Sequence, residues 1–200
     1  MTSLLESLER ADQDATLAIN TFSSPFMDGF WSFFSDRLVW IPLYLLLAVL
    51  LFVRLGWRKA LVALVVVGLT ILLADRISVL VKGWAERLRP CWDERMLSRG
   101  LRVLEGRGGK YGFFSSHAAN ALGLALCTLG CMKLRSDRRF NGCYGTLVVV
   151  WALLVALSRI FVGKHFLGDV LVGLLAGGII GLLMSRLARF VVSRAGWQGV

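Results

Sequence analysis

Both histidines of the chain stand among polar residues of the kinds that enzymes use for group transfer. FSSH ends at His117, and the longer stretch SRIFVGKHFLGD contains His165 and Asp169. His165 and Asp169 are four residues apart, which puts them on one face of a helix. A carboxylate bonded to one imidazole nitrogen fixes the tautomer and makes the other nitrogen a better nucleophile. The pair is therefore suited to nucleophilic catalysis.

Three basic residues accompany the histidines. Lys82 and Arg89 are seven residues apart in KGWAERLRP, on one helix face if that helix continues until Pro90 stops it. Arg159 precedes His165 in the second stretch. Arginine binds phosphate oxygens through paired N–H donors, and lysine acts as a point charge. These cations predict a cradle for a phosphoryl group.

Serines and the second histidine complete this chemistry. Hydroxyl and backbone N–H donors at the start of a helix bind phosphate oxygens, and Ser115 and Ser116 stand at such a position. His117 can protonate a leaving oxygen because the pKa of histidine lies near ambient pH. Asp169 is the only acid in this set, and the four cysteines lack metal-ligand spacing, so we expect no metal and no other cofactor. The residues predict metal-independent phosphoryl transfer.

The segments that carry these residues are apolar enough for a membrane. Hydrophobic residues make up 56% of the chain, against roughly half in soluble domains. A spanning helix needs about 20 mostly apolar residues, and lipid-exposed backbone must satisfy its own hydrogen bonds. The prediction is an all-α, polytopic membrane helical bundle rather than a large soluble helical protein. Its five expected spans are 39–55, 60–81, 113–132, 143–163 and 165–184.

On this five-span arrangement the candidate residues converge. Each of them falls at the same end of the bundle, where charged groups usually face the interior and mark a working site. Gly173, Gly177 and Gly181 continue the helix face of His165 and Asp169, and small residues let helices approach closely. We therefore expect the histidine and the aspartate to point into the bundle.

Two further polar residues near the site have two open interpretations each. Asp75 precedes Lys82 by seven residues and would either partner a cation of the site or pair locally with Arg76. Ser158 ends its span and would either touch the phosphate or cap the chain.

The first 38 residues differ from the rest. SLLESLERADQDATLAI mixes apolar and charged residues at helical spacing, which predicts an amphipathic helix in the membrane interface. It lacks the basic start and short apolar core of a cleavable signal peptide, so we expect it to be retained. SSPFMDGFWSFFSDRL predicts a second interfacial helix. The alternative is that residues 17–38 span the membrane as a sixth helix.

The net charge of +10 is distributed in a way that argues against nucleic-acid binding. One set of helix ends carries short basic segments that are nearly free of acid, as cytoplasmic loops are. We therefore expect the C-terminus in the cytoplasm and the candidate site on the outer face of the membrane. The basic segments contain Arg54, Arg58, Lys59, KLRSDRR at 133–139, Arg186, Arg189 and Arg194.

The three motifs resemble those of the type 2 phosphatidic acid phosphatases, the membrane branch of the superfamily that includes vanadium haloperoxidases. KGWAERLRP fits the Lys-x6-Arg-Pro motif, and SRIFVGKHFLGD fits Ser-Arg-x5-His-x3-Asp in full. FSSH resembles Pro-Ser-Gly-His, with Phe114 in place of proline and Ser116 in place of glycine. The motifs occur in the family's order and are joined by apolar spans.

The resemblance implies a fold and a set of roles. The fold would be a helical bundle with the site at one end of its spans. His165 would attack phosphorus to form a phosphohistidine, Asp169 would orient His165, and His117 would protonate the leaving group. Water would then hydrolyse the phosphohistidine. The phosphate would be bound by Lys82, Arg89, Arg159, Ser115 and Ser116.

The expected protein is a lipid phosphatase of a bacterial inner membrane, with its site facing the periplasm. Residues 1–200 would form one domain, in which 1–38 are interfacial, 39–184 are transmembrane and 185–200 are a cytoplasmic tail. The family's substrates are undecaprenyl diphosphate, phosphatidylglycerophosphate, phosphatidic acid and lipid A 1-phosphate. The alternatives are a lipid phosphotransferase that uses the same histidine, and a non-catalytic protein that binds or transports lipid.

The loop at 91–112 is expected to select the headgroup. A polyanionic headgroup, such as a diphosphate or a lipid A, would suit its basic residues, although a surface loop beside lipid headgroups would carry them too. Gly108, Gly109 and Gly112 would bend the loop into the third span. Its basic residues are Arg95, Arg99, Arg102, Arg107 and Lys110.

Overall fold

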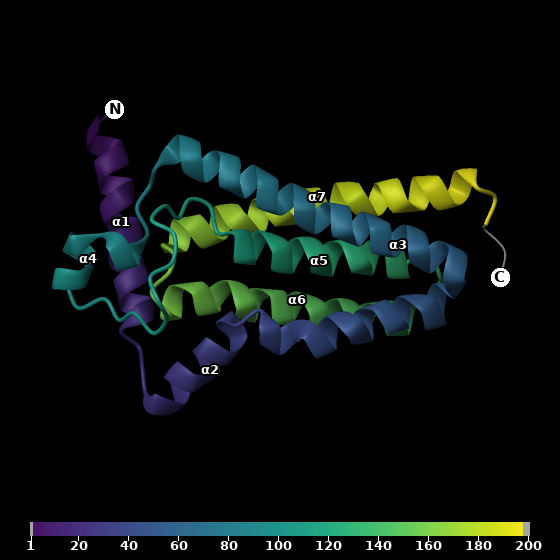
Figure 1. The fold of residues 1–200 in the computed structure, drawn as a ribbon, viewed down its shortest axis with the longest axis horizontal. Coiled ribbons are helices and arrows are strands. Elements are labelled where there is room, and N and C mark those ends of the chain that lie inside the picture. The colour runs from purple at the N-terminus through teal and green to yellow at the C-terminus, as the bar shows by residue number, and fades with distance from the viewer. Residues whose placement is uncertain (1, 198–200) are drawn as a thin grey trace.

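The computed structural model describes residues 2–197, and every regular element in that range is a helix. This confirms the all-α prediction. The long helices run beside one another, and the short ones gather at one end of the molecule (Figure 1). The elements are α1 (Thr2–Asn20), α2 (Pro25–Ser35), η1 (Leu38–Trp40), α3 (Ile41–Ala85), η2 (Pro90–Trp92), α4 (Glu94–Ser98), α5 (Ser116–Met132), α6 (Arg138–Phe161) and α7 (Leu167–Arg194).

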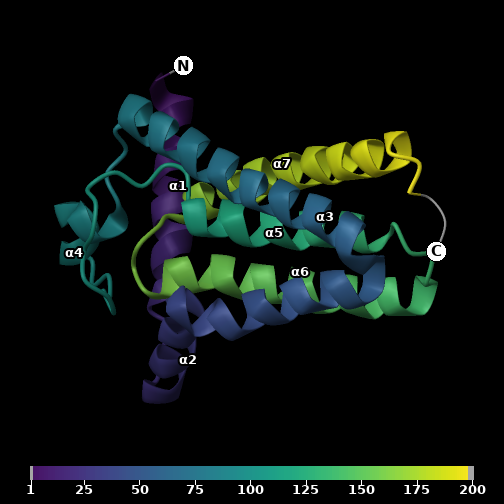
Figure 2. The same cartoon turned by 45° about the vertical axis from the view of Figure 1, so that its right-hand side comes forward.

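Helix α3 contains two of the expected apolar segments, joined without a loop. Its backbone leaves the helical conformation at Gly56, where φ is +74° and ψ is 163°. Glycine adopts this φ easily because it has no Cβ. The chain reverses direction there, and the second half runs back along the bundle (Figures 1 and 2). The segments 39–55 and 60–81 are therefore two helical runs, with a tighter turn between them than expected.

Tryptophans mark the two ends of the second half of α3. The side chains of Trp57 and Trp84 are 63% and 85% exposed. At 1.5 Å per residue, the helix between them is about 40 Å long. That length is close to the thickness of a bilayer with its interfacial regions, where tryptophan is enriched. This helix is thus built to reach from one membrane surface to the other.

Three helical stretches of the described chain are long and apolar enough to cross a membrane, namely Leu38–Ala85, α6 and α7. Helix α5 has 17 residues and lies inside the bundle against α3, α6 and α7. Helix α6 begins five residues before the expected span at 143–163. Helix α7 continues ten residues beyond the expected end at 184, so residues 185–194 of the predicted tail are helical.

The packing of α7 against α5 follows the predicted ladder of glycines. A Cβ added at Gly177 would overlap with the backbone of Ala119, and one added at Gly181 would meet the backbone of Gly123 at 2.5 Å. A Cβ at Gly173 would likewise meet the carbonyl oxygen of Ser115 at 2.5 Å. The backbones of the two helices can approach this closely only because these positions lack side chains. The predicted close packing on this face is confirmed.

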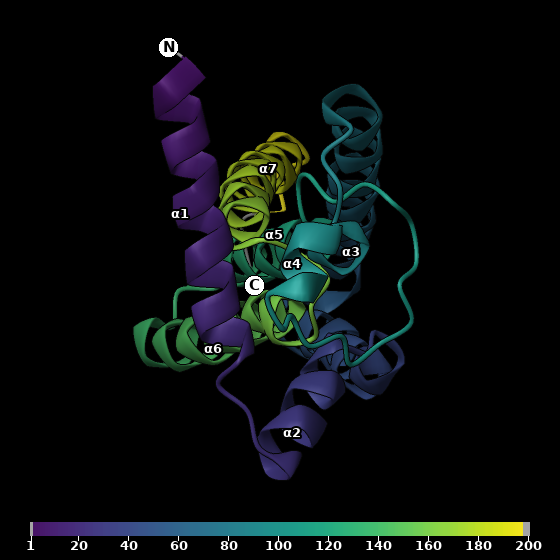
Figure 3. The same cartoon turned by 90° about the vertical axis from the view of Figure 1, so that its left-hand side faces the viewer.

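Helices α1 and α2 lie at the end of the bundle. Helix α1 crosses over the ends of the long helices, which is clearest when the molecule is viewed from that end (Figure 3). Ser24 caps α2 by accepting a hydrogen bond from the backbone of Met27, and Pro25 occupies its first turn. The alternative of one spanning helix over 17–38 is therefore wrong, because the chain ends α1 at Asn20 and starts an 11-residue helix at Pro25.

The buried face of α1 is polar. Thr16 and Asn20 are fully buried, whereas Leu4, Leu5 and Leu8 are about 60% exposed. The helix is amphipathic as predicted, but it turns hydroxyl, carboxylate and amide groups toward the bundle and leaves its leucines free to face lipid.

Apolar side chains occupy both the inside and the outside of the bundle. The largest core cluster joins both halves of α3 to α5 and α6, through residues such as Leu51, Val66, Leu124 and Val148. Large apolar side chains also cover the outer surface. Contact with lipid does not destabilise such a surface, whereas in water it would favour aggregation. They include Leu45, Val53, Val65, Leu147, Leu175, Ile179 and Leu183.

Candidate active site

The predicted residues meet at the end of the bundle covered by α1, α2 and α4. A cavity of about 610 Å³ opens there between α3, α5 and α6. Arg89, Ser116, His117, Arg159 and His165 all line it. Segments more than 75 residues apart in sequence thus deliver their polar side chains to one place.

His165 lies in the turn between α6 and α7, outside both helices. Helix α7 begins only at Leu167, so the expectation that His165 and Asp169 share a helix face is wrong. They meet nevertheless, because Asp169 reaches back over the helix start as a cap. Its Oδ2 accepts a hydrogen bond from the backbone N–H of Phe166 at 3.1 Å and faces His165 Nδ1 at 3.4 Å. A carboxylate in this place accepts a hydrogen bond from an Nδ1–H, and in that tautomer Nε2 carries the free lone pair.

The imidazole of His165 is buried and surrounded by cations. Its side chain is 2% exposed. Burial lowers the pKa of His165 well below its ordinary value of 6.5, because a buried imidazole cannot be hydrated when charged. The neighbouring cations lower this pKa further, and both effects favour the neutral ring. In order of effect they are Arg159, Arg89, Lys82 and Lys164.

The two serines of the second motif have different roles: Ser115 caps a helix, whereas Ser116 lines the cavity. Ser115 is fully buried and caps α5, where its hydroxyl oxygen accepts a hydrogen bond from the backbone of Ala118. It does not line the cavity, contrary to expectation, because the helix start uses its side chain. Ser116 lines the cavity, and its hydroxyl lies 2.5 Å from Lys82 Nζ. The residue that replaces the family's glycine therefore holds a site lysine.

Arg89 reaches the site from a loop rather than from a helix. Helix α3 ends at Ala85 and is stopped by Glu86 in the left-handed conformation, so it does not continue to Pro90 as expected. Arg89 is extended, and its Nε donates to the carbonyl of Tyr111 at 3.0 Å. An isolated antiparallel bridge between Leu88 and Tyr111 fixes this strand of the loop. Lys82 and Arg89 are thus brought together by the loop instead of by helical periodicity.

Arg159 is buried at the end of α6 and keeps donors free. Its Nη1 donates to Ser35 at the end of α2 and lies 3.5 Å from Glu105 Oε2. Its Nε is buried and has no hydrogen-bond partner in the described chain. Sequence reasoning missed Ser35 and Glu105, since neither stands near a motif.

Ser158 and Lys164, two further polar residues of the third motif, have structural contacts. The hydroxyl of Ser158 donates to the carbonyl of Val155 within α6 at 2.7 Å. The ammonium of Lys164 donates to the carbonyl of Gly106 and so fastens the loop before α5 to the turn. Ser158 is therefore used within its own helix, and Lys164 braces the loop beside the site.

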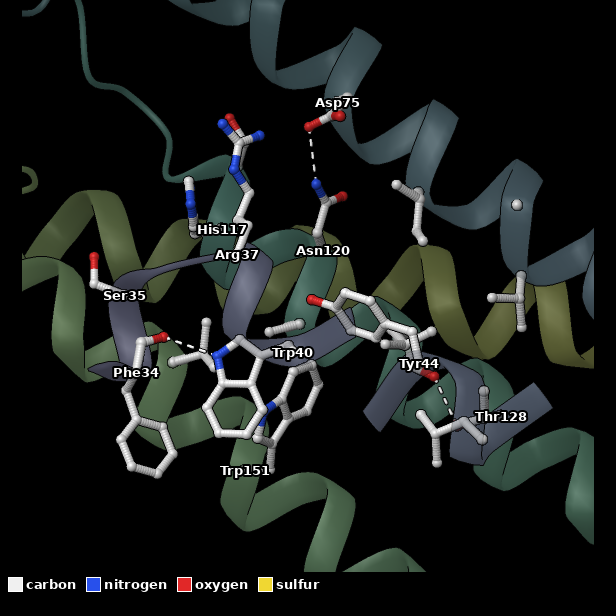
Figure 4. Close-up of a pocket in the computed structure, with 18 of the residues that line it drawn as sticks. Phe34, Ser35, Arg37, Trp40, Tyr44, Asp75, His117, Asn120, Thr128 and Trp151 are labelled. Atoms are coloured by element: carbon white, nitrogen blue, oxygen red, sulfur yellow. Dashed lines mark hydrogen bonds between the residues drawn. The ribbon is translucent and has the colours of Figure 1, made fainter. Parts of the chain in front are cut away.

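Two more polar residues at the site, Arg37 and Arg87, were not predicted, and a third, Asp75, had two open interpretations. Arg37, between α2 and η1, lines the cavity. Arg87 donates to Asp169 Oδ1 at 2.7 Å and to Asp12 Oδ2 at 2.6 Å. Asp75 lines the cavity and accepts a hydrogen bond from Asn120 at 2.8 Å, so it has a partner on α5 rather than Arg76 (Figure 4).

The loop at 91–112 uses most of its basic residues to hold the N-terminal helices. Arg99 pairs with Asp14 of α1 at 2.6 Å, and Arg102 pairs with Asp28 of α2. Arg95 pairs with Asp93 at 3.1 Å and also reaches Glu9 of α1 at 3.5 Å. These three arginines therefore have structural partners, which favours the surface interpretation for them.

Arg107 and Lys110 differ from the other basic residues of the loop. Neither forms an ion pair within residues 2–197, and each stacks instead on an aromatic ring, Arg107 on Trp92 and Lys110 on Tyr111. Gly108 and Gly112 permit the bend beside them. Gly108 has a φ of +64°, and a Cβ at Gly112 would meet Asp169 Oδ2 at 3.1 Å. The loop therefore passes directly over the carboxylate partner of His165.

The cavity has a polar end and an apolar body. From the histidines it continues between the helices past Leu47, Leu51, Leu124 and Val155 to Thr128. Figure 4 shows aromatic side chains along this wall, including Trp40, Tyr44 and Trp151. His117 and Thr128 are eleven residues apart on α5, so the cavity extends about 16 Å into the membrane-embedded part of the bundle. Such a shape fits a polar group at the site and an acyl chain below it.

The described chain contains no group of three or more histidine, cysteine, aspartate and glutamate residues placed to hold a metal ion. The charges that converge on the cavity are instead those of lysine and arginine side chains. Arg37, Arg89 and Arg159 line the cavity, and positive side chains of this kind are suited to bind an anion such as a phosphate monoester.

The family to which this architecture belongs is identified by comparison. The family model of the PAP2 superfamily matches residues 59–192, and the chain belongs to that superfamily. It is accordingly a membrane lipid phosphatase, a phosphoric monoester hydrolase. The predicted resemblance is confirmed.

Individual relatives agree with this assignment. The chain is 32% identical over 193 residues to the lipid A 4'-phosphatase of Bacteroides thetaiotaomicron, covering 96% of this chain and 83% of that protein. It is 29% identical to the lipid A 4'-phosphatase of Porphyromonas gingivalis, covering 98% of this chain and 79% of that protein.

Solved structures share the fold. The PAP2-type phosphatidylglycerolphosphate phosphatase of Bacillus subtilis superposes with a TM-score of 0.69 at 20% identity, over 94% of this chain and 87% of that one. Aquifex aeolicus LpxE superposes with a TM-score of 0.64 at 23% identity, over 86% and 93% of the two chains.

Proposed function

We propose that the protein removes the 4'-phosphate of lipid A, through a phosphohistidine on His165. The names of two relatives that cover nearly the whole chain support this substrate over the others considered, which were undecaprenyl diphosphate, phosphatidylglycerophosphate, phosphatidic acid and the 1-phosphate of lipid A. The observation that carries the mechanism is the buried, neutral His165, fixed by Asp169 and facing a cavity where the site cations converge.

The phosphate would lie between the cations and the two histidines. Arg159 supplies the unpaired Nε donor, Arg89 supplies its Nη groups, and Lys82 supplies charge through its ammonium. The Ser116 hydroxyl stands beside Lys82 as a further donor. Donors that are already oriented stabilise the charge that grows on the phosphoryl oxygens in the transition state without reorganising.

In the first step, Nε2 of His165 attacks phosphorus, and a P–N bond forms as the bond from phosphorus to the lipid oxygen breaks. His117 gives its proton to that oxygen, so that the lipid leaves as an alcohol. Throughout this step, Asp169 accepts a hydrogen bond from Nδ1–H of His165 and stabilises the positive charge that develops on the ring.

In the second step, a water molecule attacks the phosphorus of the phosphohistidine. His117 now takes a proton from this water, as the reverse of its earlier role requires. The P–N bond breaks, inorganic phosphate leaves, and His165 returns to its neutral form. All protons and bonds are accounted for by the two histidines and one water.

The rest of the lipid would occupy the apolar body of the cavity and the adjoining bilayer. An acyl chain fits the wall formed by Leu47, Leu51 and Leu124. Arg107 and Lys110, which lack carboxylate partners in the described chain, are available for a second anionic group of the headgroup. The site would face the periplasm, and residues 1–200 would work as one domain.

The test is product analysis with purified protein in detergent, using bisphosphorylated lipid A labelled with ³²P. We expect loss of the 4'-phosphate with retention of the 1-phosphate, read by mass spectrometry. We also expect acid-labile label on the protein, which is lost in His165→Ala. Ser158→Ala, whose hydroxyl bonds only within α6, is the matched control and should remain active.

Three outcomes would overturn the proposal in different ways. Release of only the 1-phosphate, or activity only on another lipid of the panel, would refute the substrate. Label transferred to a second lipid instead of to water would make the protein a phosphotransferase. Full activity of His165→Ala would refute the phosphohistidine.

A further inference from the structure

The carboxylate of Asp169 is held by more than the histidine that it orients. Its Oδ2 faces His165 and caps Phe166, while its Oδ1 accepts a hydrogen bond from Arg87 Nη1 at 2.7 Å. Asp169 is fully buried, and this charge-assisted contact helps to fix the rotation of its carboxylate. The direction in which Asp169 presents Oδ2 to His165 therefore depends on Arg87.

Arg87 in turn is shared between two carboxylates. Its Nη2 donates to Asp12 Oδ2 of α1 at 2.6 Å, and its guanidinium lies over the ring of Phe166 at 4.2 Å. Burial opposes its charge, but Asp169 and Asp12 outweigh this and raise the pKa of Arg87. One cation between two anions leaves a net negative charge. Asp12 thus prevents Arg87 from neutralising the charge that Asp169 directs at His165.

The same face of α1 also holds the start of α7. Oδ1 of Asp12 accepts a hydrogen bond from the backbone N–H of Gly168 at 2.7 Å. Thr16, one turn further along α1, accepts one from the backbone N–H of Leu167 at 2.9 Å. The first N–H groups of a helix have no partner within the helix, and here α1 supplies those partners.

One turn further again, α1 holds the end of α6. The side-chain amide of Asn20 donates to the carbonyls of Ile160 and Phe161 at 3.1 and 2.9 Å. Its oxygen accepts from the backbone of Arg102 at 2.8 Å. Residues 12, 16 and 20 of one helix therefore fix both ends of the five-residue turn that carries His165.

We infer that Arg87 and Asp12 are positioning residues of the phosphatase reaction, and that α1 is a working part of the active site. Neither residue needs to touch the substrate. Arg87 aims the carboxylate of Asp169 at the nucleophile, and Asp12 balances the charge of Arg87 while anchoring the turn. The inference rests on the proposed role of His165 as the nucleophile.

The first test compares Arg87→Met and Asp12→Asn with the wild type in lipid phosphate release. We expect kcat to fall by about 10- to 100-fold for Arg87→Met, the usual effect of losing a partner that orients a catalytic group. KM should change little, because the phosphate-binding side chains remain. Asp12→Asn should lose less, since Asn can still accept the hydrogen bond from Gly168.

The pH profile of kcat/KM separates positioning from a simple loss of fold. Removing the cation Arg87 should move the acid limb to higher pH, because the imidazole then protonates more easily. Removing the anion Asp12 should move the limb to lower pH. In Arg87→Lys the acid limb should lie close to its wild-type position, whereas kcat should recover only in part.

Several other charged or titratable groups face His165 and are unchanged in these variants. They are Lys82 and Arg89 from α3 and its loop, His117 from α5, Arg159 from α6, Lys164 from the turn and Asp169 from α7.

The matched control is Asp14→Asn on the same helix. Asp14 is 63% exposed and pairs with Arg99 on the outer side of α1, so its loss should leave kcat and the pH profile unchanged. The inference is overturned if Arg87→Met, shown to be folded by thermal unfolding in detergent, keeps the wild-type kcat and acid limb. It is also overturned if both variants shift the limb in the same direction. Failure of the wild type to release phosphate from any lipid would instead refute the proposed function.

Discussion

At the scale of single residues, the proposed chemistry requires an imidazole that is uncharged although positive groups surround it. The pKa of His165 is lowered by burial and by neighbouring arginine and lysine side chains. In the proposed mechanism the neutral ring is the nucleophile, so on the acid side activity is lost as pH falls below this lowered pKa. We therefore expect the acid limb of kcat/KM to lie clearly below pH 6.5, measured with a lipid phosphate in mixed micelles.

Lys164, which does not line the cavity, offers a way to check that prediction. Lys164→Gln removes a charge that lowers the pKa of His165 but keeps a donor for the carbonyl of Gly106. The acid limb of this variant should move to higher pH. An acid limb at or above pH 6.5 in the wild type would contradict the assignment of His165 as a buried neutral nucleophile.

The residues that sequence could identify are those with informative local spacing. Lys82, Arg89, His117, Arg159 and His165 stand in short motifs, and their convergence at one end of the bundle was predicted. Arg87 and Asp12 could not be found in this way, because they are 75 residues apart and their pairing depends on where α1 crosses the bundle. The capping role of Ser115 was missed because a serine at a helix start suits a phosphate and a cap equally.

At the scale of secondary structure elements, the contact between α5 and α7 places Asp169 beside the start of α5. The backbone N–H of Ser115 donates to the carbonyl of Asp169 at 3.0 Å. Gly177→Val would push the helices apart, since even a Cβ there overlaps with the backbone of Ala119. We expect this variant to lose about 1–3 kcal/mol of stability or more, together with activity, measured by thermal unfolding in detergent.

Gly142→Ala is the control for that variant. Gly142 lies near the start of α6, and a Cβ there would meet nothing within 4 Å. The change should leave activity intact and raise stability by up to about 1 kcal/mol, as alanine favours helix. Equal stability of Gly177→Val and the wild type would mean that the two helices are not held at the distance described.

Hydropathy predicted the long helices well because lipid demands long apolar runs. The ends of these helices were predicted less accurately, because an apolar run does not show at which residue a helix is capped. Helix α7 starts two residues later than expected, which moves His165 into a turn. The amphipathic pattern of α1 was recognised, but the periodicity alone does not tell which face docks, and the polar face is the one that does.

At the scale of the whole molecule, charge differs between the two ends. The end opposite the site carries the basic segments near Arg58 and Arg135, with Asp137 as the only acid in them, and the C-terminal end of α7 lies there too (Figures 1 and 2). We expect this end in the cytoplasm. A fluorescent reporter fused to the C-terminus should be active there, and an alkaline phosphatase fused at the same point should not be. The opposite pattern would place the site in the cytoplasm.

The overall architecture was predictable because few arrangements satisfy five apolar runs in a membrane. The turn at Gly56 and the location of α2 were not, since both depend on packing between segments distant in sequence. The path of the 91–112 loop could not be predicted from the sequence either. Arg99 and Arg102 looked suited to a headgroup, and their carboxylate partners on α1 and α2 emerge only when the helices are placed.

The crossing of α1 over the bundle has a consequence for the order in which the site is assembled. Asp12, Thr16 and Asn20 leave the ribosome before their backbone partners at residues 160–168, which follow 140 to 156 residues later in the chain. Helix α1 can therefore make these contacts only after the turn between α6 and α7 has been synthesised. A chain that has been synthesised only as far as α5 already contains Lys82, Arg89 and His117, but it still lacks the turn that carries His165. The turn that carries His165 can therefore be held at both of its ends only after residues 160–168 have met α1, so this part of the site is assembled after α6 and the start of α7 have been made.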